Sequence, residues 1–252
     1  MNENYRDFLK DGIRKTVDFS QTAQSRGVAE PPWQKPCRAD ERKIALVAAG
    51  DWSIPECSLE KAIAQRRSRR KFAGAALSLE ELSFLLWTTQ GLRPTSSSYK
   101  NFRTVPSAGC RHALETYIAA LRVEGLDKSI YRYLPIDHAL VEAGRHPGLE
   151  GHLAEATFGQ RFCGTGAATF VWTAVPARME WRYAEASYKV IAIDAGHACQ
   201  NLYLACENIG CGTCAVAAYD QERMDRLLGV DGAEEFTVYL APVGKVAEDK
   251  NE

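Results

Sequence analysis

Residues 66–72 read Arg-Arg-Ser-Arg-Arg-Lys-Phe, and this stretch decides how the rest of the chain is interpreted. Four arginines and a serine lie within five residues, although the formal net charge of the 252-residue chain is only −1. Arginine binds phosphate through a planar, permanently charged guanidinium, and serine adds a short neutral donor. Basic segments also suit the negative pole of a helix dipole, and many are simply solvated. From this stretch alone, a phosphate site and a solvated helix end are both open interpretations.

The composition of the chain is that of an ordinary globular protein. Hydrophobic residues make up 46% of it and charged residues 25%, with a pI of about 6.5. A near-neutral balance argues against a nucleic-acid binder, which needs a basic face. No apolar run approaches membrane-spanning length, and residues 1–10 do not resemble a signal peptide. We therefore expect a cytoplasmic protein with no nucleic-acid or membrane partner, whose eight cysteines are thiols.

The chain is predicted to divide at residue 58. Residues 1–57 are expected to form an N-terminal extended arm, because the stretch from Pro31 to Pro36 is proline-rich and nothing here resembles an independent core. Residues 58–252 are expected to form one domain. Periodicity and capping residues predict helices from Ser58 into the arginine stretch and over 78–91, 149–162, 180–209 and 220–228, and strands over 114–123, 129–134, 168–175 and 236–243. This pattern indicates an α+β fold with one mixed sheet.

The cysteines at 206, 211 and 214 have the spacing C-x4-C-x2-C, which matches three of the four ligands of plant-type iron–sulfur ferredoxins. No cysteine follows Cys214, and Cys206 falls within the predicted helix, where a small thiol packs like alanine. Neither the histidine spacing nor any other motif indicates a metallohydrolase. We therefore predict no metal site, and we interpret these thiols, including the pair Cys211 and Cys214, as packed rather than redox-active.

Three other segments gain meaning when they are considered together. Pro106-Ser107-Ala108-Gly109 is a turn of small residues just before a predicted strand, so backbone donors there can approach a flat ligand. Residues 210–218 form a connection of glycine and other small residues after the long predicted helix. Gly244-Lys245 places a cation at the end of the last strand. Each is an ordinary turn by itself, but a flat, anionic cofactor would use all of them and the arginine stretch.

This combination resembles the FMN-dependent nitroreductase family, and within it the SagB-type dehydrogenases, which include oxidases of azoline-containing peptides. The resemblance rests on residues 66–72, 104–109, 194–204, 210–220 and 238–245, and it covers roughly residues 58–246 in family order. It implies a nitroreductase-like mixed sheet flanked by helices in an intertwined homodimer, with two FMN sites at the interface. The predicted helix from Glu180 would then form the core of the dimer.

The resemblance also implies roles for individual residues. The first arginines and the serine would bind the FMN phosphate and ribityl oxygens, and the last arginine would lie near the pyrimidine edge of the flavin ring. The turn at 106–109 would reach the ring from the partner subunit, and residues 216–218 would present backbone to flavin N5. The implied cofactor contacts are Arg66, Arg67, Ser68, Arg70, Pro106, Ser107, Ala108, Gly109, Val216, Ala217, Ala218 and, as a second phosphate cation, Lys245.

The implied activity is a two-step oxidation and reduction. NADH or NADPH would deliver hydride to FMN N5 and leave, and a small acceptor such as a nitroaromatic or a quinone would then be reduced in the same pocket. No dedicated catalytic residue is required, because the cofactor carries the chemistry; Arg182 and Tyr183, with Tyr188 and Lys189, are the polar candidates. Many bacterial nitroreductases have an acidic residue where this chain has Ala217, so substrate preference need not transfer. The alternatives are an FMN-dependent dehydrogenase or oxidase of a modified peptide or heterocycle, and a non-catalytic flavin-binding protein.

Overall fold

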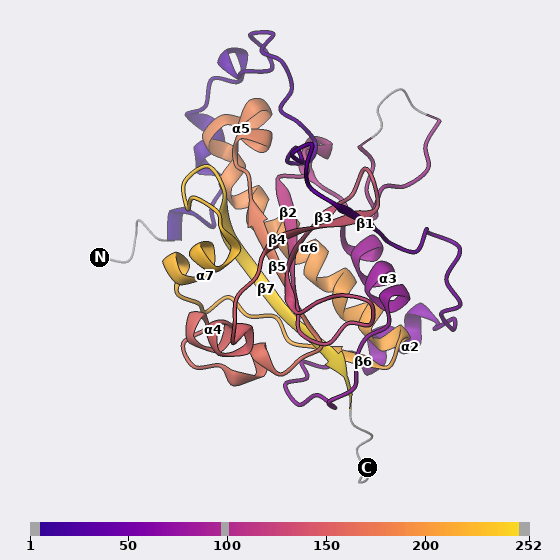
Figure 1. The fold of residues 1–252 in the computed structure, drawn as a ribbon. Coiled ribbons are helices and arrows are strands. Elements are labelled where there is room, and N and C mark those ends of the chain that lie inside the picture. The colour runs from indigo at the N-terminus through magenta and orange to yellow at the C-terminus, as the bar shows by residue number, and fades with distance from the viewer. Residues whose placement is uncertain (1–5, 97–100, 247–252) are drawn as a thin grey trace.

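The computed structural model describes residues 6–96 and 101–246 and is built around one sheet (Figure 1). The strands follow the order β1-β4-β3-β2-β5-β7-β6, and every pair of neighbours is antiparallel. Parallel pairing among the described residues occurs at the isolated bridges Ser68–Thr213 and Leu77–Val123. The predicted α+β fold is confirmed. The strands are β1 Lys43–Ala45, β2 Leu114–Ala120, β3 Ser129–Leu134, β4 Ala139–Gly144, β5 Ala168–Ala174, β6 Cys211–Thr213 and β7 Phe236–Lys245.

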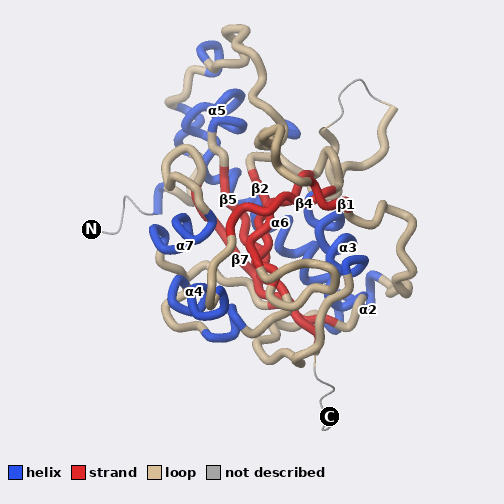
Figure 2. Tube along the Cα trace, in the orientation of Figure 1, coloured by secondary structure: helices blue, strands red, loops and turns tan. Residues whose placement is uncertain are grey.

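Helices cover both faces of the sheet (Figures 1 and 2). Alternation along β2 and β5 directs Ile118 and Phe170 into a core with α3 and α6, and Tyr117 and Val171 into a second core with α4 and α7. Both central strands are therefore buried throughout. The helices are α2 Leu59–Gln65, α3 Leu79–Gln90, α4 Leu149–Ala156, α5 Ala177–Tyr183, α6 Ser187–Asn208 and α7 Gln221–Leu228. Within the described ranges, none of them is long and apolar enough to span a bilayer.

Helices α2 and α3 begin at the capping residues that the sequence predicts. Ser58 caps α2 by accepting a hydrogen bond from the Lys61 N–H at 3.2 Å. Ser78 and Glu81 form the predicted capping box of α3, with distances of 3.1 and 3.0 Å. The helix ends at Gly91, where a Cβ would lie 2.3 Å from the Trp87 side chain. Glycine is therefore required there by a close contact.

The predicted helix over 180–209 is wrong as one element. Its first residues belong to α5, and Ala184 then adopts φ 44° and ψ −134°, outside the α-helical region, at the start of the short 3-10 turn η5 Ala184–Ala186. Helix α6 starts only at Ser187. Both segments direct apolar residues into the same core, so the helical period continues across the break and hides it.

The predicted helix over 149–162 is too long. Helix α4 ends at Ala156, and Phe158 and Gly159 follow with φ of 54° and 82°. The Gly159 N–H donates to the Ala154 carbonyl at 2.8 Å, which closes the last turn of the helix. A glycine three residues beyond the end was the signal that could have shortened the prediction.

The segment before α2 crosses the sheet and joins it. It contains the short 3-10 turns η1 Gly12–Lys15 and η2 Phe19–Gln21, and its strand β1 pairs with β4 at the edge of the sheet. Between η2 and β1, the backbone of this segment is hydrogen-bonded to buried side chains of β2 and β3. The Lys35 N–H donates to Glu115 at 2.7 Å, and Arg132 donates to the Lys35 and Pro36 carbonyls at 2.7 and 3.1 Å.

Candidate functional site

The arginine stretch follows the C-terminus of α2 and runs into the edge of the sheet. The Arg66 N–H donates to the Ala62 carbonyl at 3.0 Å and closes the last turn. Ser68 then bridges Thr213 of β6, and the Arg69 N–H donates to the Thr213 carbonyl at 2.9 Å. This pairing fixes the backbone while the side chains of Arg67, Ser68 and Arg70 remain exposed.

Tyr203 on α6 connects the arginine stretch to the predicted flavin-facing backbone. Its hydroxyl lies 2.9 Å from Ser68 Oγ and accepts a hydrogen bond from the Ala215 N–H at 2.8 Å. The Arg66 guanidinium lies over the ring, 5.3 Å from its centroid. Tyr203 belongs to the segment that carries the family resemblance, but nothing local in the sequence separates its role from that of a packed helix residue.

The segment after Ala215 lies on β7 and leaves two residues exposed. Val216 and Leu240 exchange backbone hydrogen bonds of 2.8 and 3.2 Å, and Ala217 and Ala218 are exposed beyond them. The Ala218 carbonyl accepts a hydrogen bond from Gln160 at 3.0 Å. Arg70 reaches the same neighbourhood, with its guanidinium 5.7 Å from the centroid of the Phe162 ring. We name residues 66–70, 203 and 215–218 the arginine site.

Lys245 lies at the same edge of the sheet, but its ammonium is already paired. Its backbone is opposite Cys211 in the β6–β7 ladder. Its Nζ donates to Glu81 and, at 3.0 Å, to the Ile209 carbonyl. The other Glu81 oxygen completes the capping box of α3. A phosphate would therefore share this cation with Glu81, and the second phosphate contact stays a prediction.

The predicted turn at 106–109 lies away from the arginine site, beside α5 and α6. Gly109 has φ 57°, and a Cβ there would lie 2.6 Å from Tyr183 Oη and 2.8 Å from Arg182 Cδ. The weak catalytic candidates Arg182 and Tyr183 therefore contact this turn directly. Figure 1 places α5 at the upper end of the molecule and α2 and β6 at the lower end. One chain does not bring all the predicted cofactor contacts together.

Tyr188 and Lys189 are separated from that pair by the break at Ala184. Both line a cavity of about 570 Å³ together with Phe8 and Ile13 from the N-terminal segment. The Tyr188 pKa is raised by a hydrogen bond with Glu180 and by burial. The structure thus assigns the four polar candidates to two different places.

Buried charges surround the residues that follow the turn. Burial, together with the positive charges of Arg103, Arg111 and Arg178, lowers the pKa of His112 to about 2. The arm covers this region: Glu30 pairs with Arg111 at 2.6 Å, and the Trp33 carbonyl accepts from Arg103 at 2.7 Å. We name residues 101–115, with α5 and residues 24–36, the arm junction.

Asp194 of α6 faces the turn from the other side. Burial raises its pKa, while hydrogen bonds from the Ser107 hydroxyl and the Ala108 N–H and the nearby His197 oppose that shift. Ser107 Oγ also accepts from the His112 N–H at 2.9 Å. The Ser107 hydroxyl is therefore engaged on both sides within this chain.

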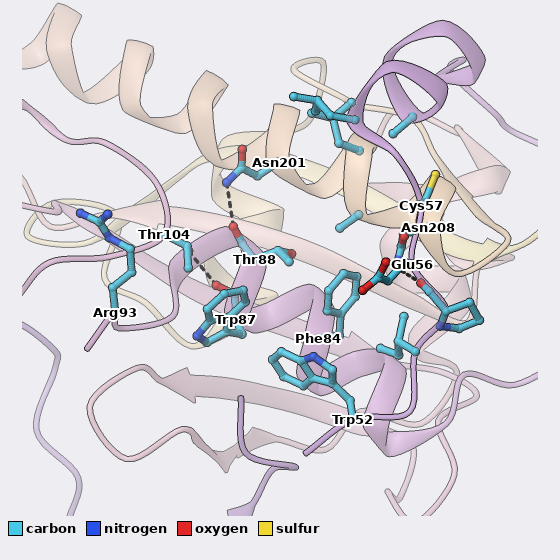
Figure 3. A pocket seen from close by; sticks show the side chains of 16 residues that line it. Trp52, Glu56, Cys57, Phe84, Trp87, Thr88, Arg93, Thr104, Asn201 and Asn208 are labelled. Atoms are coloured by element: carbon cyan, nitrogen blue, oxygen red, sulfur yellow. Dashed lines mark hydrogen bonds between the residues drawn. The ribbon is translucent and has the colours of Figure 1, made fainter. Parts of the chain in front are cut away.

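A cavity of about 680 Å³ opens between residues 52–57, α3 and α6 (Figure 3). Trp52 forms its aromatic wall with Phe84 and Trp87, at centroid distances of 5.5 Å each. Asn201 and Asn208 of α6 face it and hold the Thr88 and Pro55 carbonyls at 2.8 and 2.9 Å. Its lining contains none of the predicted cofactor contacts.

The three spaced cysteines are all buried. Burial raises the pKa of Cys211 to about 12 and that of Cys206 well above its ordinary value. Cys214 is also buried. Among the residues that the structure describes, no three His, Cys, Asp or Glu side chains form a group that could hold a metal ion.

Comparison with known proteins identifies similar chains. The model of the nitroreductase family matches residues 63–245. A Methanocaldococcus jannaschii protein provisionally named a nitroreductase is 31% identical over 196 residues, covering 77% of this chain and 94% of that protein. A solved structure from Anabaena variabilis, also provisionally named a nitroreductase, has a TM-score of 0.67 and 24% identity over 83% of this chain. This chain spans only 42% of the Anabaena chain.

A chain of the E. coli microcin synthetase complex McbBCD, solved with truncated pro-MccB17 bound, has the same fold. Its TM-score is 0.61 and its identity 19%, over 81% of this chain and 78% of the other. At these identities the two solved structures show the fold alone. The predicted nitroreductase-like fold is confirmed, and the SagB-type branch stays a prediction.

Proposed function

The chain belongs to the nitroreductase family, and from this premise we propose that it is an FMN-dependent NAD(P)H oxidoreductase. Hydride would come from NADH or NADPH, and a small nitroaromatic, quinone or similar acceptor would be reduced in a ping-pong reaction. The observation that carries the proposal is the arginine site. At this site, Tyr203 connects two exposed segments. One is the arginine stretch with Ser68, whose side chains can donate hydrogen bonds to a phosphate, and the other is the run of small residues after Ala215.

The residues of the arginine site fit an anionic flavin. Arg66, Arg67 and Ser68 would bind the phosphate and ribityl oxygens, and Arg70 would place positive charge at the pyrimidine edge. Ala217 and Ala218 carry no side chain large enough to keep a flat ring from the backbone. When bound, FMN would supply the hydride chemistry, and the chain would supply position and electrostatics.

We also propose that the protein is a homodimer in which the second copy completes the site. Gly109 lies against Arg182 and Tyr183 of α5. Figure 1 shows α5 at the other end of the molecule from α2 and β6, so a second copy would bring this turn to the flavin. Helix α6 carries a suitable outward face: Ile193 is 47% exposed, and a Cβ on Gly196 would meet nothing within 4 Å. Leu59 and Ile63 of α2 are exposed as well. The cavity of Figure 3 lies between these helices, on a surface that a second copy would cover.

The division of the chain is part of the same proposal. Residues 58–252 would form the FMN-binding domain, and residues 1–57 an arm that supports the turn at 106–109. The contacts of Glu30 and Trp33 with Arg111 and Arg103 support this role.

The first test is the colour of the purified protein. We expect flavin absorption bands, release of FMN rather than FAD on denaturation, and oxidation of NADH or NADPH when a quinone or nitroaromatic acceptor is added. Sedimentation should give a dimer at micromolar concentration. A protein that fails to take up added FMN would contradict the proposal, and one that binds FMN without turnover would be a flavin-binding protein instead.

A second candidate function is oxidation of an azoline or another heterocycle in a modified peptide. The contact of Arg182 and Tyr183 with Gly109 favours it, because it places a cationic hydrogen-bond donor and a phenol hydroxyl beside the turn expected at the flavin. In an assay with an azoline-containing peptide, Tyr183→Phe should lower the rate of heterocycle oxidation while leaving quinone reduction by NAD(P)H unchanged. Equal loss of both activities would reject this candidate.

A further inference from the structure

The hydroxyl of Tyr203 lies between two donors of different kinds. The side chain is buried, with 9% of the residue exposed, and its Oη lies 2.8 Å from the Ala215 nitrogen and 2.9 Å from Ser68 Oγ. Ser68 and Tyr203 are 135 residues apart in the sequence. Ser68 is exposed to solvent and follows Arg66 and Arg67 directly in the chain.

The direction of one of these hydrogen bonds follows from the groups that make it: a backbone N–H can only donate, so Tyr203 Oη accepts from Ala215. In the bond between the two hydroxyls either oxygen can be the donor. When Tyr203 is the donor, its hydrogen has Ser68 Oγ as its acceptor. A serine oxygen that receives this bond keeps its own hydrogen for a ligand on the exposed side. Were the serine to donate to Tyr203 instead, an incoming anion would meet only its lone pairs, which repel negative charge.

We propose that Tyr203 is a positioning residue that orients the Ser68 hydroxyl as a donor to the terminal phosphate of the cofactor. The hydrogen bonds run in one direction, from the Ala215 N–H through Tyr203 and Ser68 to the phosphate. Successive hydrogen bonds polarise one another, so each donor strengthens the next. The same hydroxyl fixes the distance between the phosphate end and residues 215–218. This inference rests on the proposed function, because it takes FMN as the ligand.

Tyr203→Phe is the discriminating substitution. It removes the hydroxyl but retains the ring beneath the Arg66 guanidinium, 5.3 Å from the centroid. A purely structural role of the ring predicts little change in ligand binding. The relay predicts a loss confined to ligands that carry a phosphate, because riboflavin presents no anion to Ser68.

The experiment titrates the apoprotein with FMN and with riboflavin and follows flavin fluorescence. It uses the wild type, Tyr203→Phe, Ser68→Ala and the double variant. We expect each single variant to weaken FMN binding about tenfold and riboflavin binding less than about twofold, consistent with one charge-assisted hydrogen bond. The double variant should bind FMN about as tightly as either single variant, because each single substitution already removes the same donor to the phosphate. Tyr131→Phe is the matched control, since it removes a tyrosine hydroxyl that donates to the Asp127 carbonyl far from the site.

The possible failures can be told apart. A wild type that does not bind FMN overturns the proposed function itself. A wild type that binds FMN equally well after Tyr203→Phe overturns the relay, and so does an equal loss of FMN and riboflavin, or additive losses in the double variant. If Tyr203→Phe does not fold, 3-fluorotyrosine at position 203 replaces it. Its more acidic hydroxyl donates more strongly, so FMN should bind about twofold tighter and riboflavin unchanged, and absence of tightening overturns the relay.

Discussion

The chain contains two groups of arginines, one at the arginine site and one at the arm junction, and they behave in opposite ways. The first is contiguous in sequence, and its Arg67 and Arg70 are exposed beside small residues. The second is dispersed, and its Arg103, Arg111 and Arg178 are buried against carboxylates and carbonyls. The contiguous arginines thus leave charge exposed to solvent, whereas the scattered arginines that meet in the fold are satisfied internally.

The comparison predicts that the arm junction dominates stability. Glu115, only 3% exposed, accepts from the Lys35 N–H and from Arg178. Glu115→Ala leaves Arg178 buried without its carboxylate, so we expect the free energy of unfolding to fall by about 3–5 kcal/mol. Urea denaturation measures this change. The control, Glu155→Ala, removes an exposed carboxylate 3.5 Å from Arg223, and the expected loss there is below about 1 kcal/mol. Similar losses of unfolding free energy for the two variants would contradict the expectation that the buried ion pair matters more than the exposed one.

The second prediction concerns acid sensitivity, also at the arm junction. The pKa of His112 is about 2 in the folded chain and 6.5 when the residue is unperturbed, so between these values the unfolded chain binds the extra proton. Stability contributed by this site is complete above about pH 6.5 and is lost as the pH falls. Between about pH 6.5 and pH 4.5 the loss should amount to about 2 kcal/mol.

His112→Asn tests the assignment. Asparagine tolerates the positive φ of 48° at this position but does not titrate. The difference in unfolding free energy between wild type and variant should therefore change by about 2 kcal/mol between about pH 6.5 and pH 4.5. Parallel curves for the two proteins would place the acid sensitivity elsewhere.

The third prediction removes one positive charge at a time from the arginine stretch. Arg66→Ala should weaken FMN binding by about one to two decades, because charge-assisted hydrogen bonds to phosphate are worth about 1.5–3 kcal/mol each. Arg69→Ala removes the same charge from the same stretch, but the Arg69 Nε lies 3.9 Å from Glu207, and this residue should matter much less. Fluorescence titration of apoprotein measures both affinities. Equal losses would return the stretch to a solvated helix end.

The smallest expected effect concerns Lys245. Glu81→Gln retains the side chain of the capping box but removes the charge paired with Lys245. If Lys245 contributes to the phosphate site, FMN should bind up to about fivefold tighter, because a partly exposed ion pair is worth about 0.2–1 kcal/mol. Glu60→Gln, which removes an exposed charge in the first turn of α2, controls for the general field. A gain equal to that of Glu60→Gln would exclude a specific role for Lys245.

Much of the fold could be predicted from the sequence, and the main failure has a physical cause. The Ser58 cap, the Ser78–Glu81 capping box and the strands near β2, β5 and β7 follow from residues within a few positions of one another. The break at Ala184 could not be predicted, because Met179 and Ile191 on either side of it pack into one core and preserve the period. The predicted site residues divide in the same way: the structure joins those of the arginine site and places Pro106–Gly109 at the opposite end.

The sequence by itself determined the caps of α2 and α3, the central strands, the contiguous arginine stretch and the family resemblance, since these depend on spacing along the chain. Only the tertiary structure decided which polar groups meet. Tyr203 joins Ser68 to Ala215 across 135 residues of sequence, and Lys35 from the arm donates to Glu115 in the middle of the sheet. The physical reason is that buried polar groups must find partners, and folding supplies those partners from distant segments that no local pattern marks.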